Sequence, residues 1–228
     1  MKAALLVGPQ KIEIRDLPVP VPREGEVLVR VREAGICGTD FAKYRGDLGG
    51  DFPVIAGHEA VGEIADLGLG VVGIHIGERV AIQPNFACGQ CETCRSGMEN
   101  ICPNRVRLGL DVDGVFAEYV TAPRKYVWTL PEGLSDSVAA LTEPLSIALH
   151  GFQKSAPVPT ALIARKELLI QGAMTYRDEF RAAIDLLQKG EIRSDLFITN
   201  IYPLEKLPEA LAGFRSPQRV KDIVKISS

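Results

Sequence analysis

Two sets of residues in this sequence have the types and spacing that could bind metal ions. The first is a run of four cysteines at C-x2-C-x2-C-x7-C spacing, namely Cys88, Cys91, Cys94 and Cys102. A structural Zn²⁺ takes four ligands in a tetrahedron, and four thiolates this close in sequence can surround one ion. The spacing therefore predicts a structural zinc site in a loop.

The second set lies upstream and is weaker when taken alone. A single cysteine such as Cys37, at the end of an expected strand, is more often a small buried apolar residue than a ligand. His58 is of the type that zinc prefers, and its neighbour Glu59 could ligate or orient it. Adjacent strand residues face opposite sides, so both reach one ion only if the backbone bends, which Gly57 permits. Without further support, a His-Glu pair is more often a surface pair.

Several motifs in one order supply that support. GHEAVG at residues 57–62, followed by Gly68 and Val71, matches G-H-E-x2-G-x5-[GA]-x2-[IVSAC], and CGTD stands at 37–40, DGVFAEY at 113–119 and EPLS at 143–146. With the spaced cysteines, these motifs resemble the zinc-containing medium-chain dehydrogenase/reductase family. The sequence is most similar to the branch with sorbitol-like polyol and threonine dehydrogenases. The resemblance covers residues 1–155 and resumes from about 161 to the end.

The resemblance implies a catalytic zinc held by Cys37, His58 and Glu59, with Glu143 as a further ligand, directly or through water. In the family the substrate hydroxyl takes the open position on the metal, whose charge lowers the pKa of that hydroxyl. Thr39 stands where a hydroxyl relays the proton away. Thr39 and Glu59 are therefore the expected catalytic residues, and two zinc ions the expected metal content.

Other polar residues near these motifs carry weaker expectations. Asp40 is expected to contact the ligands, although an aspartate at a strand end is as often a turn former. Ala42 stands where many relatives have the histidine of an outer proton relay, so that route is absent or replaced. Tyr44, His75 and His150 are interpreted as structural residues.

The elements that must position these residues are mainly short strands, followed by helices in the last third. Pattern and turn residues predict strands at 2–7, 12–16, 26–36, 58–66, 79–83, 115–121, 126–130, 161–171, 196–199 and 221–226. Helices are expected at 143–154, at 175–189 with a capping box of Thr175 and Asp178, and at 208–214. The expected fold class is mainly β with short helices (α+β), a GroES-like barrel.

A nucleotide-binding domain is expected to be missing. The only G-x-G-x-x-G match, at residues 68–73, precedes a turn and a strand rather than the helix that would hold a pyrophosphate. In relatives a Rossmann domain lies between segments like 143–154 and 161–171. The expected organisation is a catalytic domain at 1–155, a junction at 156–160 where that domain is deleted, and a segment at 161–228 that completes the catalytic domain.

Composition is that of an ordinary globular protein. The 228 residues are 46% hydrophobic and 24% charged, with net charge −3, and no block of basic residues suggests nucleic acid or an anionic membrane as partner. No signal peptide or membrane span is evident, so a cytoplasmic location is expected. Thiols stay reduced there, which favours metal binding over disulfides.

The expected function is that of the catalytic domain of a zinc-dependent alcohol or polyol dehydrogenase. The reaction implied by the resemblance is NAD(P)-dependent oxidation of a secondary alcohol to a ketone, with NAD(P) bound only by the parent enzyme. Without that domain, the chain is expected to be unable to transfer hydride alone. Two alternatives stay open: zinc-dependent hydrolysis or hydration in an open cleft, and a non-enzymatic zinc-stabilised scaffold. Apolar surface exposed by the missing domain would favour homo-oligomers.

Overall fold

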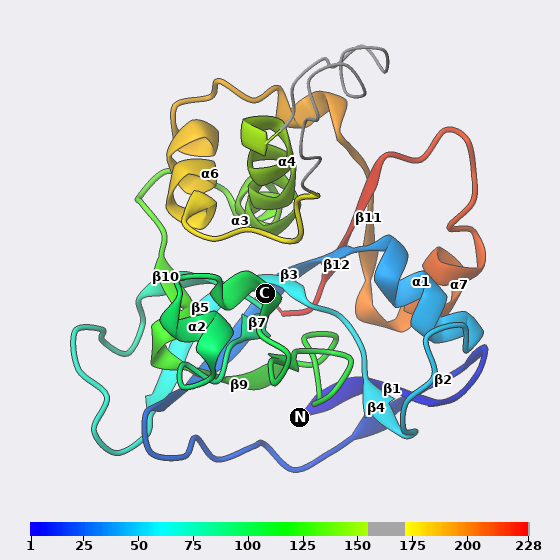
Figure 1. Ribbon diagram of the computed structural model, residues 1–228. Helices are drawn as coiled ribbons and strands as arrows, with labels where there is room; N and C mark the ends of the chain where they lie inside the picture. The colour runs from blue at the N-terminus through cyan, green and yellow to red at the C-terminus, as the bar shows by residue number, and fades with distance from the viewer. Residues whose placement is uncertain (155–171, 228) are drawn as a thin grey trace, which may run out of the picture.

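A seven-stranded sheet lies at the centre of the computed structural model, which describes residues 1–154 and 172–227 (Figure 1). Its strand order is β10-β6-β5-β3-β12-β11, and β9 also pairs with β3. The strands are β3 (Glu26–Ile36), β5 (Glu59–Leu67), β6 (Arg79–Ile82), β9 (Tyr119–Pro123), β10 (Val127–Thr129), β11 (Ile198–Pro203) and β12 (Lys221–Lys225). β3 is the longest, and it pairs with β9 along its first half and with β12 along its last residues.

Smaller sheets pack beside the central one. One contains β1 (Lys2–Gly8), β2 (Lys11–Asp16) and β4 (Val54–Ile55); the other pairs β7 (Asn85–Phe86) with β8 (Val106–Arg107). The main core lies between these layers. Val27, Val29 and Val31 alternate along β3 and are fully buried, as the two-residue period of a strand requires.

Three helices gather at one end of the central sheet, α3 (Asp136–Ala139), α4 (Thr142–Lys154) and α6 (Glu179–Gln188) (Figure 1). Phe180, Ala183, Ile184 and Leu187 form the buried face of α6, and all of them except Ala183 belong to a second core. Elsewhere, the described residues form the helices α1 (Gly38–Arg45), α2 (Glu92–Arg95) and α7 (Leu207–Ala212), with 3-10 turns η1 (Glu99–Ile101), η2 (Arg124–Tyr126), η3 (Ser194–Leu196) and η4 (Leu204–Lys206).

The architecture confirms the expected fold class, mainly β with short helices. Within residues 1–154 and 172–227, the only parallel strand pair is β11 with β12, so these residues contain no doubly wound sheet. Among the same residues, no helix has the length and apolar character needed to cross a bilayer. The expected strand at 161–171 and the expected junction at 156–160 lie outside the described residues.

The structure corrects the expected start of the helix at 175–189. Thr175 has a positive φ of 52°, and Asp178 makes no side-chain cap bond, so these residues form no capping box. The helix begins instead at Glu179, whose carboxylate accepts a hydrogen bond from the backbone N–H of Arg177 at 2.6 Å. A hydrogen bond between the Arg177 backbone and the Glu179 side chain, two residues apart, therefore takes the place of the predicted capping box.

Other elements also differ from expectation. The strand predicted at 196–199 begins only at Ile198, as β11, after the 3-10 turn η3. The strand predicted at 115–121 begins only at Tyr119, because Gly114 and Phe116 donate backbone hydrogen bonds to the carbonyls of Ile55 and Ala56 instead. The helix α1 was not predicted, since it is short and has no clear apolar face.

Candidate metal centres and active-site cavity

Cys37, His58 and Glu59 meet at one point although they come from different segments. One ligand atom from each, the Cys37 Sγ, a His58 ring nitrogen and a Glu59 carboxylate oxygen, lies within 4.8 Å of the others. Cys37 is the N-cap residue of α1, and His58 directly precedes β5. The bend that the sequence requires is present at Gly57, where φ is +92°, and a Cβ there would lie 2.9 Å from the Phe116 ring.

Asp40 orients this group from the first turn of α1. It is 1% exposed, and its carboxylate accepts hydrogen bonds from the backbone N–H groups of Cys37 at 2.8 Å and Gly57 at 3.2 Å. Its Oδ1 also lies 3.1 Å from the His58 Nδ1. An Nδ1–H that donates to Asp40 leaves the lone pair of Nε2 available as a ligand. Burial opposes the charged form of His58, but Asp40, Cys37 and Glu59 outweigh it and raise the His58 pKa well above its usual value.

Glu59 has a cationic partner that the sequence did not reveal. The Lys221 Nζ, at the start of β12, lies 2.9 and 2.8 Å from the two carboxylate oxygens, and Glu59 is 1% exposed. Although burial opposes the charge of Lys221, the Glu59 carboxylate raises the pKa of the Lys221 ammonium. The Glu59 side chain packs over Gly35 of β3, where an added Cβ would come 2.1 Å from its Oε2.

Glu143 lies near this group but outside it, in the first turn of α4. Burial, followed by the charge of Glu59, raises the pKa of its carboxyl to about 7. Its Oε2 is buried without a hydrogen-bond partner. The nearby Tyr176 hydroxyl accepts a hydrogen bond from the Asn85 Nδ2 at 3.1 Å. Burial, then Glu143, raises the pKa of Tyr176 well above its usual value.

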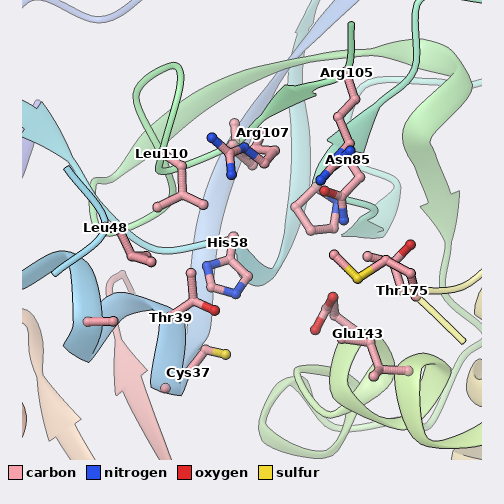
Figure 2. Close-up of a pocket in the computed structure, with 16 residues that line it drawn as sticks. Cys37, Thr39, Leu48, His58, Asn85, Arg105, Arg107, Leu110, Glu143 and Thr175 are labelled. Carbon is pink, nitrogen blue, oxygen red and sulfur yellow. The ribbon is translucent and has the colours of Figure 1, made fainter. Parts of the chain in front are cut away.

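A cavity of about 420 Å³ lies beside this group (Figure 2). Cys37, Thr39 and His58 line one side, and Glu143 reaches in from another. Thr39, in the first turn of α1, is half-buried and near Cys37 in the view. Ala42 also lines the cavity, so no histidine projects from that turn of α1. The structure thus brings Cys37, His58, Glu143 and Thr39 to one cavity, while Glu59 meets Cys37 and His58 without lining it.

The four clustered cysteines form a second, separate group. Their Sγ–Sγ distances are 3.4 Å for 91–94, 3.5 Å for 88–102, 3.8 Å for 91–102 and 3.9 Å for 88–94. A tetrahedron of thiolates around zinc, with Zn–S bonds of about 2.3 Å, has edges of about 3.8 Å. Backbone N–H groups of Gln90 and Cys91 lower the pKa of the Cys88 thiol to about 6, which favours the thiolate form that binds metal.

Residues interpreted as structural lie outside both groups. Among the residues that line the cavity, Tyr44 is absent; it packs against the main core and is half-buried. His75 is exposed in a turn and contacts Glu78, while His150 is buried on α4 beside Glu179. After the glycines at 68–73, the chain forms turns and then β6, so the expected absence of a following helix is confirmed.

Sequence reasoning missed Lys221, Tyr176 and Asn85, and also Arg105 and Arg107, which line the cavity. Lys221 pairs with Glu59, which lies 162 positions earlier, and Asn85 donates a hydrogen bond to Tyr176, which lies 91 positions later. No local pattern marks such pairs, because they depend on which strands the fold places side by side. A lysine at the start of a strand has no distinctive spacing to reveal it.

Comparison with known proteins agrees with these motifs. The alcohol dehydrogenase GroES-like domain family matches residues 23–132. The sorbitol dehydrogenase of Bacillus subtilis is 39% identical over 169 residues, which cover 72% of this chain and 48% of that protein. The L-threonine 3-dehydrogenase of Pyrococcus horikoshii is 38% identical over 165 residues, or 71% and 46% of the two chains. The chain spans about half the length of the curated relatives it matches.

Solved structures show the same fold. The crystal structure of an alcohol dehydrogenase from Escherichia coli CFT073, complexed with NADH, superposes with a TM-score of 0.89. It is 25% identical, and the alignment covers 99% of both chains. The domain match, the polyol and threonine dehydrogenase relatives and the β architecture agree. The chain therefore belongs to the zinc-containing medium-chain dehydrogenase/reductase family.

Proposed function

We propose that this chain is the zinc-binding catalytic part of an alcohol or polyol dehydrogenase that oxidises a secondary alcohol to a ketone. The observation that carries the proposal is the meeting of Cys37, His58 and Glu59 beside a cavity of about 420 Å³. The relatives named sorbitol dehydrogenase and L-threonine 3-dehydrogenase support the substrate class.

The donor atoms fit a zinc ion. Sulfur, imidazole nitrogen and carboxylate oxygen are its preferred ligands, and Glu143 offers a buried Oε2 that has no partner among the described residues. When bound, Zn²⁺ would supply a Lewis acid that lowers the pKa of a substrate hydroxyl. Cys88, Cys91, Cys94 and Cys102 would hold the second, structural ion. The proposed content is two zinc ions per chain.

The chain's own residues would orient the substrate and carry its proton. Thr39 lines the cavity beside Cys37, so its hydroxyl can accept the substrate proton and donate its own toward solvent. Asp40 fixes the His58 ring, and Lys221 holds Glu59 in place. Ala42 offers no side-chain acceptor to extend the relay, so in our proposal the proton passes from Thr39 to water.

Hydride transfer also needs a nicotinamide, which we propose that this chain does not hold alone. Residues 1–154 and 172–227 contain no dinucleotide-binding fold, and the chain spans about half the length of its curated relatives. We place the missing domain at residues 156–160, between a catalytic domain at 1–155 and a completing segment at 161–228. NAD(P) belongs to the parent enzyme in this proposal.

Metal analysis and a cofactor assay test these points. Purified wild-type chain should contain two zinc ions, and Cys37→Ser and Cys91→Ser should each lose one while keeping the other. Alcohol-dependent reduction of NAD⁺ or NADP⁺ should stay at background. Zinc content of one or none in the wild-type chain would contradict the two-site proposal, and clear dehydrogenase turnover would contradict the missing-domain proposal.

The location and assembly of the chain follow from the same features. Four thiols committed to a metal favour a reducing compartment such as the cytoplasm.

Apolar side chains are exposed on and beside β11, at Leu196, Phe197, Ile201 and Val220. We propose that this face associates with a second copy of the chain.

A further inference from the structure

Two arginines line the cavity on the wall that faces the candidate zinc ligands. Arg105 lies between the cysteine loop and β8, and Arg107 belongs to β8. Figure 2 shows both reaching in from the side opposite Cys37 and Glu143. Oxidation of a neutral alcohol does not need two cations at this place.

Arg105 has no carboxylate partner of its own in the part of the chain that the structure describes, although the charge of Asp111, the partner of Arg107, also acts on it. Arg105 forms no ion pair there; its Nη1 donates to the carbonyl of Cys102 at 3.1 Å, and its Nε is buried without a hydrogen-bond partner. Leaving a buried N–H group unpaired costs free energy, unless a bound molecule accepts the hydrogen bond. A guanidinium in this state is a ready partner for an anion.

Arg107 is held in place by Asp111, which lies outside the cavity. Its Nε and Nη2 donate to the two oxygens of Asp111 at 2.8 and 2.7 Å, and Asp111 does not line the cavity. This wall therefore has two guanidinium groups and one carboxylate, a net positive charge. Such a wall attracts anions and strengthens their binding inside a cavity more than in open water.

We propose that the substrate of this site carries an anionic group, a carboxylate or a phosphate monoester, which Arg105 binds while a hydroxyl of the same molecule faces Cys37 and His58. The proposal rests on the proposed function, because it takes this cavity as the place where the alcohol binds. A guanidinium matches both anions through two parallel hydrogen bonds. A neutral polyol of the same length would leave Arg105 unpaired and bind more weakly.

Calorimetric titration of the zinc-loaded chain tests this proposal with three ligands: sorbitol, sorbitol 6-phosphate and gluconate. The expected result is at least tenfold tighter binding of one or both anionic ligands at low salt, with a smaller advantage at high salt. The tighter of the two anions identifies the phosphate or the carboxylate as the preferred group. The proposal would be overturned if sorbitol bound as tightly as the two anions, or if neither anion bound.

Matched variants separate Arg105 from the metal, which can also bind anions. Arg105→Gln should remove the anion preference, Arg105→Lys should keep part of it, and Arg193→Gln, an exposed arginine away from the cavity, should leave it unchanged. In Cys37→Ser, the ratio of anionic to neutral affinity should persist. A preference that survives Arg105→Gln, or disappears in Cys37→Ser, would place the anion on the metal and refute the proposal.

Zinc content, measured for each variant, separates this inference from the proposed function. A chain that shows the Arg105-dependent preference but binds zinc only at the cysteine loop would refute the catalytic metal centre and leave the anion site standing. A chain with two zinc ions and no anion preference would refute the anion site and leave the catalytic metal centre standing.

Discussion

At the scale of single residues, the candidate catalytic site depends on a buried ion pair. Glu59 is 1% exposed, and it meets the ammonium of Lys221, whose Nζ also donates to the Ile36 carbonyl at 3.3 Å. A buried carboxylate is costly without a cation, so a partner of this kind lets the site keep a charged residue before any metal arrives.

We expect Lys221→Met to destabilise the metal-free chain. Removing one partner of a buried ion pair costs about 3–5 kcal/mol, because the other charge stays buried and unpaired. Urea unfolding of the metal-free protein measures the loss. Lys225→Met, on the exposed side of the same strand, is the control and should change the free energy of unfolding by less than about 0.5 kcal/mol.

The double variant Lys221→Met/Glu59→Gln completes this test. A neutral glutamine needs no cation, so the double variant should recover part of the stability that Lys221→Met loses. If Lys221→Met unfolds at the same urea concentration as the wild-type chain, the ion pair does not stabilise the fold.

The sequence predicted the residues of the site better than the contacts that support it. Cys37, His58 and Glu59 stand in short motifs that a single stretch of sequence can reveal. Lys221 and Tyr176 act across long sequence separations, and only the pairing of β12 with β3 and the packing of α6 bring them near. Strand pairing is set by the whole core, so local patterns could not specify these partners.

At the scale of elements, a buried contact joins α4 to α6. The His150 Nδ1 lies 2.8 Å from the Glu179 Oε1, and both side chains are nearly inaccessible. Since Glu143 lies in the first turn of α4, this contact also helps to hold the carboxylate that faces the cavity. The two helices therefore position the site as a unit.

This contact predicts a pH dependence of stability. Burial opposes ionisation of Glu179, but the hydrogen bonds from His150 and the backbone N–H of Arg177 outweigh it and lower its pKa below the usual 4.5. A lowered folded-state pKa stabilises the fold above the unfolded-state value, and this contribution is lost as the pH falls below about 4.5. Urea unfolding should show a steeper loss between about pH 5 and pH 3 in the wild-type chain than in Glu179→Gln.

The exposed Glu191→Gln serves as the control for this pH series and should follow the wild-type curve. At neutral pH, Glu179→Gln should be less stable by about 1–2 kcal/mol, since a charge-assisted hydrogen bond is lost. Parallel curves for Glu179→Gln and the wild-type chain would show that the contact has no role in the pH response.

The cysteine loop makes a different prediction, because its four thiols are placed to share one ion. Its α2 helix has four residues, and Arg95 is exposed at the end of that helix. Removing zinc with a chelator should let the loop open and make the bond after Arg95 sensitive to trypsin. Mass spectrometry of the early fragments measures the rate; cleavage after the exposed Arg193 is the internal control and should not change. Equal cleavage after Arg95 with and without zinc would exclude a structural role for the ion.

At the scale of the whole molecule, an apolar face is open to solvent beside the last two strands. Leu196, Ile201 and Val220 are 64%, 54% and 61% exposed, and β11 ends the strand order of the central sheet. An exposed edge strand with apolar neighbours favours pairing with another chain.

We expect the chain to associate with itself, and Ile201→Lys to weaken that association. A charge on this face opposes both edge pairing and apolar contact. Sedimentation velocity over a hundredfold range of concentration should show a rising average mass for the wild-type chain and a lower one for the variant. Leu69→Lys replaces an even more exposed apolar residue elsewhere and should behave as wild type. A constant monomer mass for the wild-type chain would contradict the proposal.

The position of β12 has a consequence for how the protein is made. β12 follows every other strand along the sequence, yet it lies between β3 and β11 and brings Lys221 to Glu59. During synthesis, β3 must wait with part of its edge unpaired until residues 221–225 have left the ribosome, several seconds or more after β3 itself, at roughly 5–20 residues per second. The nascent chain therefore carries an open strand edge and an uncompensated carboxylate through most of its translation, and this interval is when a chaperone would matter most.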